Sequence, residues 1–442
     1  MIYAIIKRSM LFTPTPSNAS ALTSIPLVVA VEMGYGHLRA AHNIAESLGT
    51  SITRMDMPPV AGPAEAALWR GILGIYTALS KACDSRLAGP AAHALLEQLT
   101  EITPLPRNNR IESANLLSHL ADRLTGNFLG RRLCKMTAGS NKQVVATYPA
   151  AAMAVRRASA SRVFCLATDT DLNRAWAARD PKSAGIEYFA PVSRVVDRLR
   201  TFGVPDSKIH LTGFPLPQSL VGQAAPILAR RIHRLDPNRT FRSQVPEPIA
   251  GLIEQAEAKY PKKPIMLTLA VGGAGGQTRH VAQILQSLRK RILDEEVHLT
   301  LVAGIRPNVV EAFERVIQSV GLPGQGRGVD ILFASAHSEY FQRFETCLAH
   351  TDILWTKPSE LVFYAALGLP ILLAPPVGGQ EHANRQWLIS NESALDAGDP
   401  SHMDSRLQQL LGGGQLCTIA WNAYSRLDRL GLDRILKILG TQ

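Results

Sequence analysis

The feature that most constrains the fold is the alternation of apolar and polar segments over residues 352–387. An apolar strand segment leads into a polar turn and an apolar helical segment that ends at Gly368. A second strand and a second polar turn then precede another helix. This order predicts a parallel α/β sheet. Ligands bind beyond the carboxyl ends of the strands in such sheets, so both polar turns are candidate ligand sites. An ordinary βαβ unit with a polar rim is the alternative.

The two turns carry side chains suited to a phosphorylated sugar. Ser359 occupies an N-cap position, where free backbone N–H groups carry partial positive charge that favours a phosphate, and Lys357 lies just before it. In the second turn, Gln380, Glu381 and Asn384 have hydrogen-bonding ends suited to sugar hydroxyls. The alternatives are a surface cation in the first turn and a polar helix start in the second.

Two further strand segments, residues 26–31 and 265–271, each lead into a glycine-rich loop and a helix. The first loop holds Gly34 and Gly36. The second loop holds four glycines and a glutamine: Gly272, Gly273, Gly275, Gly276 and Gln277. Glycine allows backbone N–H groups to come within hydrogen-bond distance of a diphosphate. The repeated strand, loop and helix predict an α/β fold with two Rossmann-like domains facing each other across a cleft.

The domain boundaries are predicted from these units. Residues 1–25 are expected to form a flexible leader and residues 26–215 the N-terminal domain. Proline and basic residues dominate residues 216–264, which predicts a linker with a helical insertion. Residues 265–417 form the C-terminal domain, and residues 418–442 contain a helix that packs back across both domains.

The net charge is +11, from 47 basic and 36 acidic residues. A basic surface favours anionic partners such as nucleotide sugars or anionic lipid head groups. Nucleic acid is not expected, because the basic residues are not interleaved with aromatic residues that stack on bases.

Targeting and redox signals predict a cytoplasmic protein. No apolar run of the sequence approaches the roughly 18 residues of a membrane span. Residues 1–12 contain an apolar run too short for a secretion signal and no cleavage site. The five cysteines are scattered, which indicates reduced thiols and no zinc site. Residues 64–135 are helical with apolar, basic-edged faces, which indicate either core packing or peripheral contact with the inner face of a membrane.

Four segments resemble a known family: GYGHLRAA (34–41), FGVPDSKIHLTGFPL (202–216), VGGAGG (271–276), and the stretch from TKPSE to GGQEHAN (356–384). In this order they resemble glycosyltransferases of the GT-B class, in the family-28 group of the monogalactosyldiacylglycerol synthases and the peptidoglycan N-acetylglucosaminyltransferase. The resemblance covers most of residues 26–387. It implies inverting transfer from a nucleotide diphosphate sugar, usually a UDP-sugar, to a lipid or other hydroxyl acceptor, without a metal or cofactor.

The resemblance also implies roles for individual residues. The acceptor is expected beside the loop of Gly34, Tyr35 and Gly36, and the nucleotide sugar in the C-terminal domain. His37 matches the glycine-loop histidine of the family, and its ordinary pKa near neutrality suits a catalytic base. Asp169 ends a strand, as a functional aspartate does in the related lipid enzymes.

Each of these residues has a structural alternative. His37 can serve as a capping or packing histidine. Asp169 can be a turn-forming residue, and the sequence does not separate it from Asp171. For the diphosphate, Arg306 is a candidate cation in addition to Lys357.

One position departs from the family pattern. The family places a ribose-binding glutamate where this chain has Phe363. Glu360, one turn earlier, is the substitute we expect, although a carboxylate in a first helical turn also favours the helix dipole. The departure keeps two alternatives open: a nucleotide-sugar epimerase of the same fold, and a non-catalytic binding protein.

Overall fold

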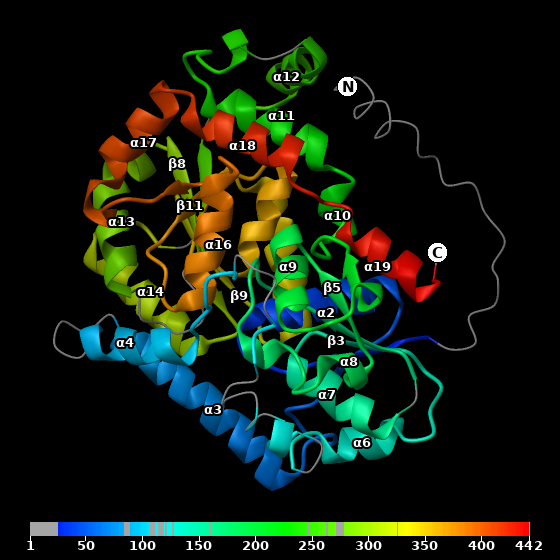
Figure 1. The fold of residues 1–442 in the computed structure, drawn as a ribbon. Coiled ribbons are helices and arrows are strands. Elements are labelled where there is room, and N and C mark those ends of the chain that lie inside the picture. The colour runs from blue at the N-terminus through cyan, green and yellow to red at the C-terminus, as the bar shows by residue number, and fades with distance from the viewer. Residues whose placement is uncertain are drawn as a thin grey trace.

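The computed structural model describes residues 25–83, 89–106, 111–113, 119, 122–125, 128–159, 161–244, 247–261, 264–270, 278–324 and 326–441. These residues form two α/β lobes, each built on a six-stranded parallel sheet (Figure 1). All but the last residue of the predicted leader lie outside the described residues. Among the described helices, none is both long and apolar enough to span a bilayer.

The N-terminal lobe contains a sheet in the order β2-β1-β3-β4-β5-β6. Its strands are β1 (Leu27–Ala30), β2 (Ile52–Arg54), β3 (Val144–Ala146), β4 (Val163–Leu166), β5 (Ile186–Ala190) and β6 (Ile209–Leu211). Its helices are α2 (Tyr35–Ser47), α3 (Pro63–Ala82), α4 (Gly89–Leu99), α6 (Arg131–Thr137), α7 (Pro149–Ala158), α8 (Pro181–Ala184) and α9 (Ser193–Thr201), with short 3-10 turns η1 (Arg174–Trp176) and η2 (Asp206–Lys208). The central strands β1, β3 and β4 are apolar throughout, as expected for a parallel sheet covered on both faces.

The C-terminal lobe contains a sheet in the order β12-β11-β10-β7-β8-β9. Its strands are β7 (Ile265–Ala270), β8 (Val297–Gly304), β9 (Val329–Phe333), β10 (Ile353–Thr356), β11 (Ile371–Leu373) and β12 (Leu395–Asp396). Its helices are α13 (Thr278–Leu293), α14 (Pro307–Ser319), α15 (His337–His350), η4 (Glu360–Leu367), α16 (Gly379–Ser390), η5 (Pro400–His402) and α17 (Met403–Gly412). Residues 352–387 therefore form β10, η4, β11 and the start of α16, in the predicted order.

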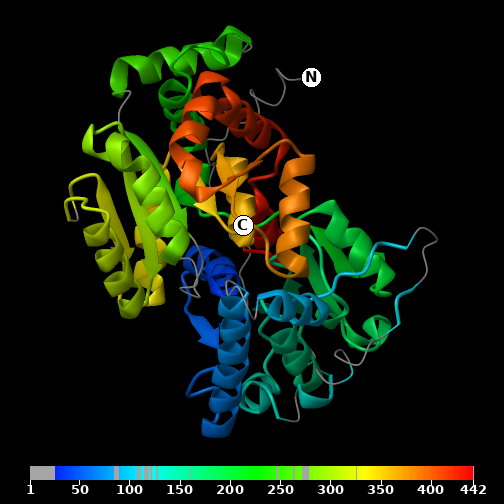
Figure 2. The same ribbon diagram turned by 90° about the vertical axis from the view of Figure 1, so that its left-hand side faces the viewer.

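Helices at the edge of the C-terminal sheet connect the lobes (Figures 1 and 2). They are α10 (Gln218–Val221), α11 (Ala224–Leu235), η3 (Arg242–Gln244) and α12 (Glu247–Lys259) before the sheet, and α18 (Gln415–Arg426) and α19 (Gly431–Leu439) after it. The prediction of one continuous terminal helix is wrong. The helix is interrupted between Arg426 and Gly431. Gly431 lies so close to the backbone of Phe214 that a side chain at position 431 would collide with the carbonyl oxygen of Phe214. This break lets α18 pack on α11 and η4 while α19 reaches α2 of the other lobe.

The short apolar helix expected after Ser359 is present and ends at Gly368. It is the 3-10 helix η4, whose eight residues are all buried, and Gly368 has a φ of 65°. Ser359 occupies the N-cap position, but its side chain makes no capping hydrogen bond. The main apolar core includes η4, α15 and the N-terminal sheet, so the two lobes are packed directly against each other.

Candidate functional site

The first glycine loop sits between the lobes. Gly34 precedes α2 with a φ of 97°, a conformation that only glycine adopts without strain. A side chain at Gly36 would lie 3.1 Å from the Oε2 atom of Glu360 in the other lobe. The loop therefore brings the start of α2, and His37 with it, to the carboxyl end of β10.

The backbone fixes the orientation of His37. Its Nδ1 atom lies 2.5 Å from the carbonyl oxygen of Thr147, which can only accept, so Nδ1 carries the proton. Thr168 Oγ1 lies 3.3 Å from the same nitrogen, and the ring packs against Tyr148 and Trp176. Burial lowers the pKa of His37 to about 4. At neutral pH the imidazole is uncharged, with its proton on Nδ1 and a lone pair on Nε2.

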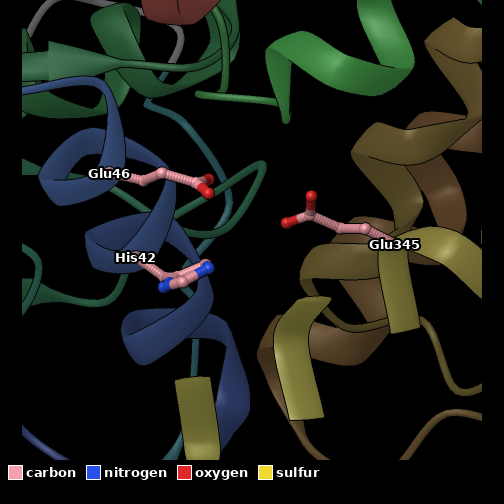
Figure 3. Close-up of side chains that lie close together, drawn as sticks. All are labelled: His42, Glu46 and Glu345. Atoms are coloured by element: carbon pink, nitrogen blue, oxygen red, sulfur yellow. The ribbon is translucent and has the colours of Figure 1, made fainter. Parts of the chain in front are cut away.

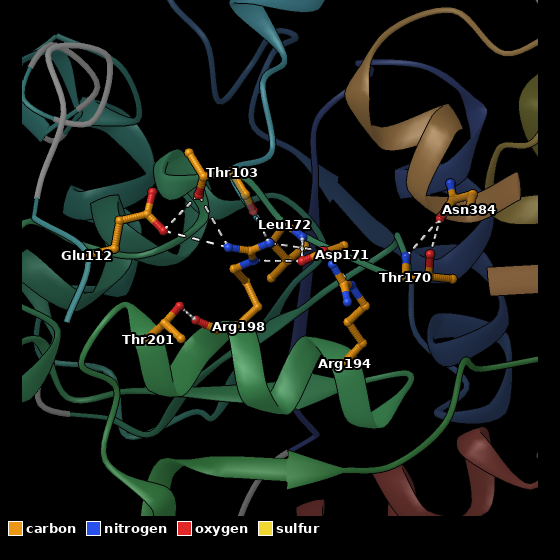
Figure 4. A network of polar contacts seen from close by, with 9 residues as sticks. All are labelled: Thr103, Glu112, Thr170, Asp171, Leu172, Arg194, Arg198, Thr201 and Asn384. Carbon is orange, nitrogen blue, oxygen red and sulfur yellow. Dashed lines mark hydrogen bonds and ion pairs between the residues drawn. The ribbon is translucent and has the colours of Figure 1, made fainter. Parts of the chain in front are cut away.

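Asp169 lies just beyond β4 and contacts the other lobe through Asn384. Asn384 Nδ2 donates to Asp169 Oδ1 at 2.9 Å and to the carbonyl oxygen of Pro358 at 3.0 Å. Its Oδ1 accepts from the backbone N–H and the hydroxyl of Thr170, both at 2.8 Å (Figure 4). Burial raises the pKa of Asp169 to about 6. Asn384 is fully buried, and its amide links the two lobes.

Asp171 occupies a different environment from Asp169. Its carboxylate accepts from Arg194 Nε and Arg198 Nε, each at 2.7 Å, and from the backbone N–H of Leu172 (Figure 4). Asp171 is fully buried beneath α9. The structure thus separates the two aspartates: Asp171 holds the loop after β4 to α9, while Asp169 faces the interlobe site.

Glu360 is the centre of the polar cluster. Its Oε1 atom accepts from Arg39 Nε at 3.1 Å across the lobe boundary, and the carboxylate is 8% exposed. Burial is the largest cause of the pKa shifts of His37, Asp169 and Glu381, and the negative charge of Glu360 acts on all three in the direction that raises the pKa. Glu360, the predicted substitute for the ribose-binding glutamate, therefore forms an ion pair between the lobes in this structure.

Glu381 and Lys357 lie on the C-terminal side of this cluster. Glu381 accepts from the backbone N–H of Val377 at 2.7 Å. Burial raises its pKa to about 7, although the positive charge of Lys357 acts in the opposite direction. Burial raises the pKa of Tyr76 on α3, and the negative charges of Glu381 and Asp169 act in the same direction. Tyr76 therefore borders the same site.

Phe363 is a core residue between the lobes. It is 4% exposed and stacks on Phe214 with ring centroids 4.5 Å apart and planes 11° apart. Trp387 of α16 lies beside it, at 5.5 Å between centroids. The position of the family's ribose-binding glutamate is therefore filled by an aromatic contact that joins the lobes.

Three comparisons place this architecture among known proteins. Residues 252–419 match a family model described as a domain of unknown function (DUF6938). A processive diacylglycerol beta-glucosyltransferase of Bacillus subtilis is 23% identical over 258 residues, which cover 57% of this chain and 56% of that protein. The matched region thus spans about half the length of this relative. The UDP-GlcNAc 2-epimerase of Neisseria meningitidis, solved with UDP-GlcNAc bound, matches with a TM-score of 0.50 and 12% identity over 94% of this chain and 99% of that chain. A candidate UDP-N-acetylglucosamine 2-epimerase of Listeria monocytogenes matches with a TM-score of 0.51 and 11% identity over 95% and 96%.

This chain has a GT-B fold and is distantly similar in sequence to the Bacillus glucosyltransferase. The predicted fold, α/β with two Rossmann-like domains facing each other, is confirmed. The resemblance read from the four sequence segments is confirmed at the same level.

Part of the predicted donor site of this GT-B protein lies outside the described residues, namely Gly272, Gly273, Gly275, Gly276 and Gln277. The described chain stops at Ala270, whose carbonyl oxygen accepts from Thr356 Oγ1 at 3.0 Å. Thr356 immediately precedes Lys357. The end of β7 and the Lys357 turn therefore lie at the same edge of the sheet.

The remaining predicted residues lie around the lobe boundary. Tyr35 accepts from the backbone N–H of Ile305 at 3.3 Å, and the guanidinium of Arg306 lies 5.5 Å from the Tyr35 ring centroid. Gln380 is partly exposed in the first turn of α16, after Gly378 with a φ of 82°. The predicted acceptor and donor loops thus meet at one interface.

Sequence reasoning missed Arg39 and the carbonyl of Thr147. Arg39 is 1% exposed and lies over the rings of Tyr340, Phe341 and Phe344. A backbone carbonyl leaves no signal in the sequence, and the burial of an arginine depends on which residues the other lobe places around it.

Proposed function

We propose that this protein transfers a sugar from a nucleotide diphosphate sugar to a hydroxyl acceptor, with inversion and with His37 as the base. The observation that carries the proposal is the state of His37: its proton is held on Nδ1 by Thr147, which leaves Nε2 free to accept one. An uncharged imidazole at an interlobe site can accept the proton of an acceptor hydroxyl, but its lowered pKa of about 4 makes it a weaker base than the ordinary histidine expected from the sequence.

The chemistry follows from this assignment. His37 Nε2 removes the proton as the acceptor oxygen attacks the anomeric carbon. The bond from that carbon to the diphosphate oxygen breaks on the opposite face, which inverts the configuration. Lys357, Arg306 and the backbone N–H groups of residues 272–277 are proposed to stabilise the departing diphosphate. No metal or cofactor enters this scheme.

Asp169 and the α16 turn complete the proposed site. Asp169 orients the acceptor or the base, while Gln380 and Glu381 contact the sugar hydroxyls. Asn384 would join them only after its hydrogen bonds to Asp169, Pro358 and Thr170 open. For the nucleotide we propose UDP, because the Neisseria structure of the same fold was solved with UDP-GlcNAc. Ser359 and Glu360 border the same donor side, and opening of the lobes would make them accessible to the nucleotide.

For the acceptor we propose a lipid at the inner face of a membrane. The Bacillus relatives are named as diacylglycerol glucosyltransferases. Large apolar side chains are exposed on α3 and α4, namely Leu68, Ile75 and Leu95. Figure 1 shows these two helices along the lower left edge of the molecule. With a net charge of +11, such a surface suits peripheral contact between a cytoplasmic protein and anionic lipid.

Product analysis tests the proposal. The full chain is incubated with labelled UDP-sugars, with and without diacylglycerol vesicles, and products are separated by chromatography. We expect free UDP and a labelled lipid only when acceptor is present. Conversion of the UDP-sugar to its epimer without acceptor would instead support the epimerase reading, which the fold of the Neisseria enzyme makes the second candidate. If neither the labelled lipid nor the epimer forms in either reaction, the proposal that this protein is a catalyst is contradicted.

A further inference from the structure

A second polar cluster lies on α2, away from the His37 site. His42 and Glu46 are four residues apart and share one face of the helix, and Glu345 of α15 points toward them from the other lobe (Figure 3). One ligand atom from each of the three side chains lies within 4.8 Å of the other two. The cluster therefore offers one imidazole and two carboxylates to a common point between the lobes.

Two atoms of this cluster lack hydrogen-bond partners among the described residues. His42 is only 9% exposed, and its Nε2 atom is buried and unpaired. The Oε1 atom of Glu345 is also buried and unpaired, while Oε2 accepts from Ser219 Oγ at 3.3 Å. Buried polar atoms are nearly always paired, because leaving them unpaired is costly. An ion that accepts both lone pairs would satisfy these two atoms together.

Neighbouring cations do not neutralise the two carboxylates. Arg39, whose charge acts on Glu345, donates its Nε proton to Glu360. Arg230 and Arg234 line the adjacent cavity but face Asp352, at 3.7 and 3.0 Å. Among the described residues, the cluster thus sets two carboxyl groups beside the buried, unpaired Nε2 atom of His42.

The cavity beside the cluster gives access to it. Its volume is about 1030 Å³, and its lining includes Glu46, Glu345, Asn43 and Ser219. An ion held by three protein ligands would keep an open side toward this cavity, where water can complete its coordination.

We propose that His42, Glu46 and Glu345 bind one divalent transition-metal ion, which ties α2 of the N-terminal lobe to α15 of the C-terminal lobe. A mixed imidazole and carboxylate set suits Zn²⁺, Co²⁺ or Mn²⁺ better than Mg²⁺ or Ca²⁺, which prefer oxygen ligands alone. Zinc ligands at about 2.0–2.2 Å from the metal lie roughly 3.4 Å from one another. The exposed side chain of Glu46 can rotate to provide this contraction.

The proposed metal site is separate from the proposed site of sugar transfer. The ring of His42 lies 5.2 Å from that of Phe341 in the other lobe, whereas His37 faces Thr147 and Trp176. The proposal therefore concerns the coupling of the lobes and does not depend on the reaction.

Metal binding by the full chain tests the proposal directly. Equilibrium dialysis measures Zn²⁺ stoichiometry and affinity, and the absorption spectrum of the Co²⁺ form reports its ligand field. We expect one ion per chain, and we expect Glu345→Gln and Glu46→Gln each to weaken binding by about 10-fold or more, in line with the loss of a direct ligand. Glu314→Gln, an exposed carboxylate on α14, is the matched control and should bind as the wild type does.

A thermal-shift measurement adds an independent readout. Zn²⁺ should raise the Tm of the wild-type chain and of Glu314→Gln, but should raise that of Glu345→Gln much less, because only a bound ion stabilises the native state. Glu46 is exposed, so Glu46→Gln remains informative even if a change at the buried His42 prevents folding. Failure of the wild-type chain to bind Zn²⁺ would overturn the proposal. Equal affinity in wild type, Glu345→Gln and Glu46→Gln would also overturn it.

Discussion

At the scale of single residues, the site depends on which nitrogen of His37 is free. The carbonyl oxygen of Thr147 fixes the proton on Nδ1, and burial keeps the ring uncharged by lowering its pKa to about 4. A histidine with this pKa is fully in the proton-accepting form at pH 7. Its position beside Trp176 and Tyr148 restricts ring rotation.

Replacing His37 tests its role as the base. We expect His37→Gln to lower kcat by about 10² to 10⁴, because proton transfer by a positioned side chain contributes roughly that factor. Donor affinity should stay close to the wild-type value, since the donor side lies in the other lobe. Steady-state rates and calorimetric titration with donor measure the two quantities. His402→Gln, at an exposed histidine in η5, is the control, and an unchanged kcat in His37→Gln would remove this residue from the role.

Asp169 yields a prediction about stability and pH. Burial raises its pKa from 3.8 to about 6, so the native state binds the proton more tightly than the unfolded state does between these values. Stability is therefore lost as the pH rises through 6. We expect Asp169→Asn to raise the free energy of unfolding by on the order of 1–2 kcal/mol at pH 8 and to have little effect near pH 4.

Urea unfolding at the two pH values checks the Asp169 prediction. If Asp169 is also a functional group, the more stable variant should have lower transfer activity. Equal stabilisation at pH 4 and pH 8 would show that the ionised carboxylate of Asp169 does not lower the free energy of unfolding.

At the scale of single elements, α2 connects most of the observations. His37 begins it, Arg39 pairs with Glu360, and His42 and Glu46 face α15. The sequence predicted this helix and its position after β1. It did not predict that a charged residue would be buried on it, because the residues that cover Arg39, namely Glu360 and three aromatic residues of α15, belong to the other lobe.

The ion pair between Arg39 and Glu360 should be essential for stability. Arg39→Met leaves Glu360 buried and unpaired, and breaking a buried pair in this way costs about 3–5 kcal/mol. The double variant Arg39→Met/Glu360→Gln should recover part of this loss, because the uncompensated charge is gone. Denaturant unfolding of both variants measures the difference. A double variant that is less stable than Arg39→Met would contradict this account.

The exposed face of α3 should determine membrane contact. Ile75 is 64% exposed, and burying such a side chain is worth about 1.5–3 kcal/mol, so Ile75→Ser should weaken binding to anionic vesicles by roughly 10-fold or more. Leu293→Ser, at a 44% exposed leucine of α13, is the control and should bind normally. Vesicle sedimentation gives both partition coefficients. The absence of wild-type binding would count against a membrane-bound acceptor.

At the scale of the whole molecule, the two parallel sheets followed directly from the sequence, because strands, glycine loops and helices alternate in both halves. Contacts between the halves did not follow. The stacking of Phe214 on Phe363 and the close approach of Gly431 to Phe214 join residues about 150 to 220 positions apart, and no local pattern specifies such pairs. The same holds for Asp169 and Asp171, which the position of α9 distinguishes.

The central claim is that an activated sugar binds between the lobes by its diphosphate. The most direct measurement is calorimetric titration of the full chain with UDP and a panel of UDP-sugars, alongside the variant Gln380→Ala/Glu381→Ala. We predict that UDP and at least one UDP-sugar bind with one site per chain, and that the double variant binds that sugar more weakly while its affinity for UDP changes little. If neither UDP nor any UDP-sugar gives a binding heat or shifts the Tm of the wild-type chain, the claim is contradicted.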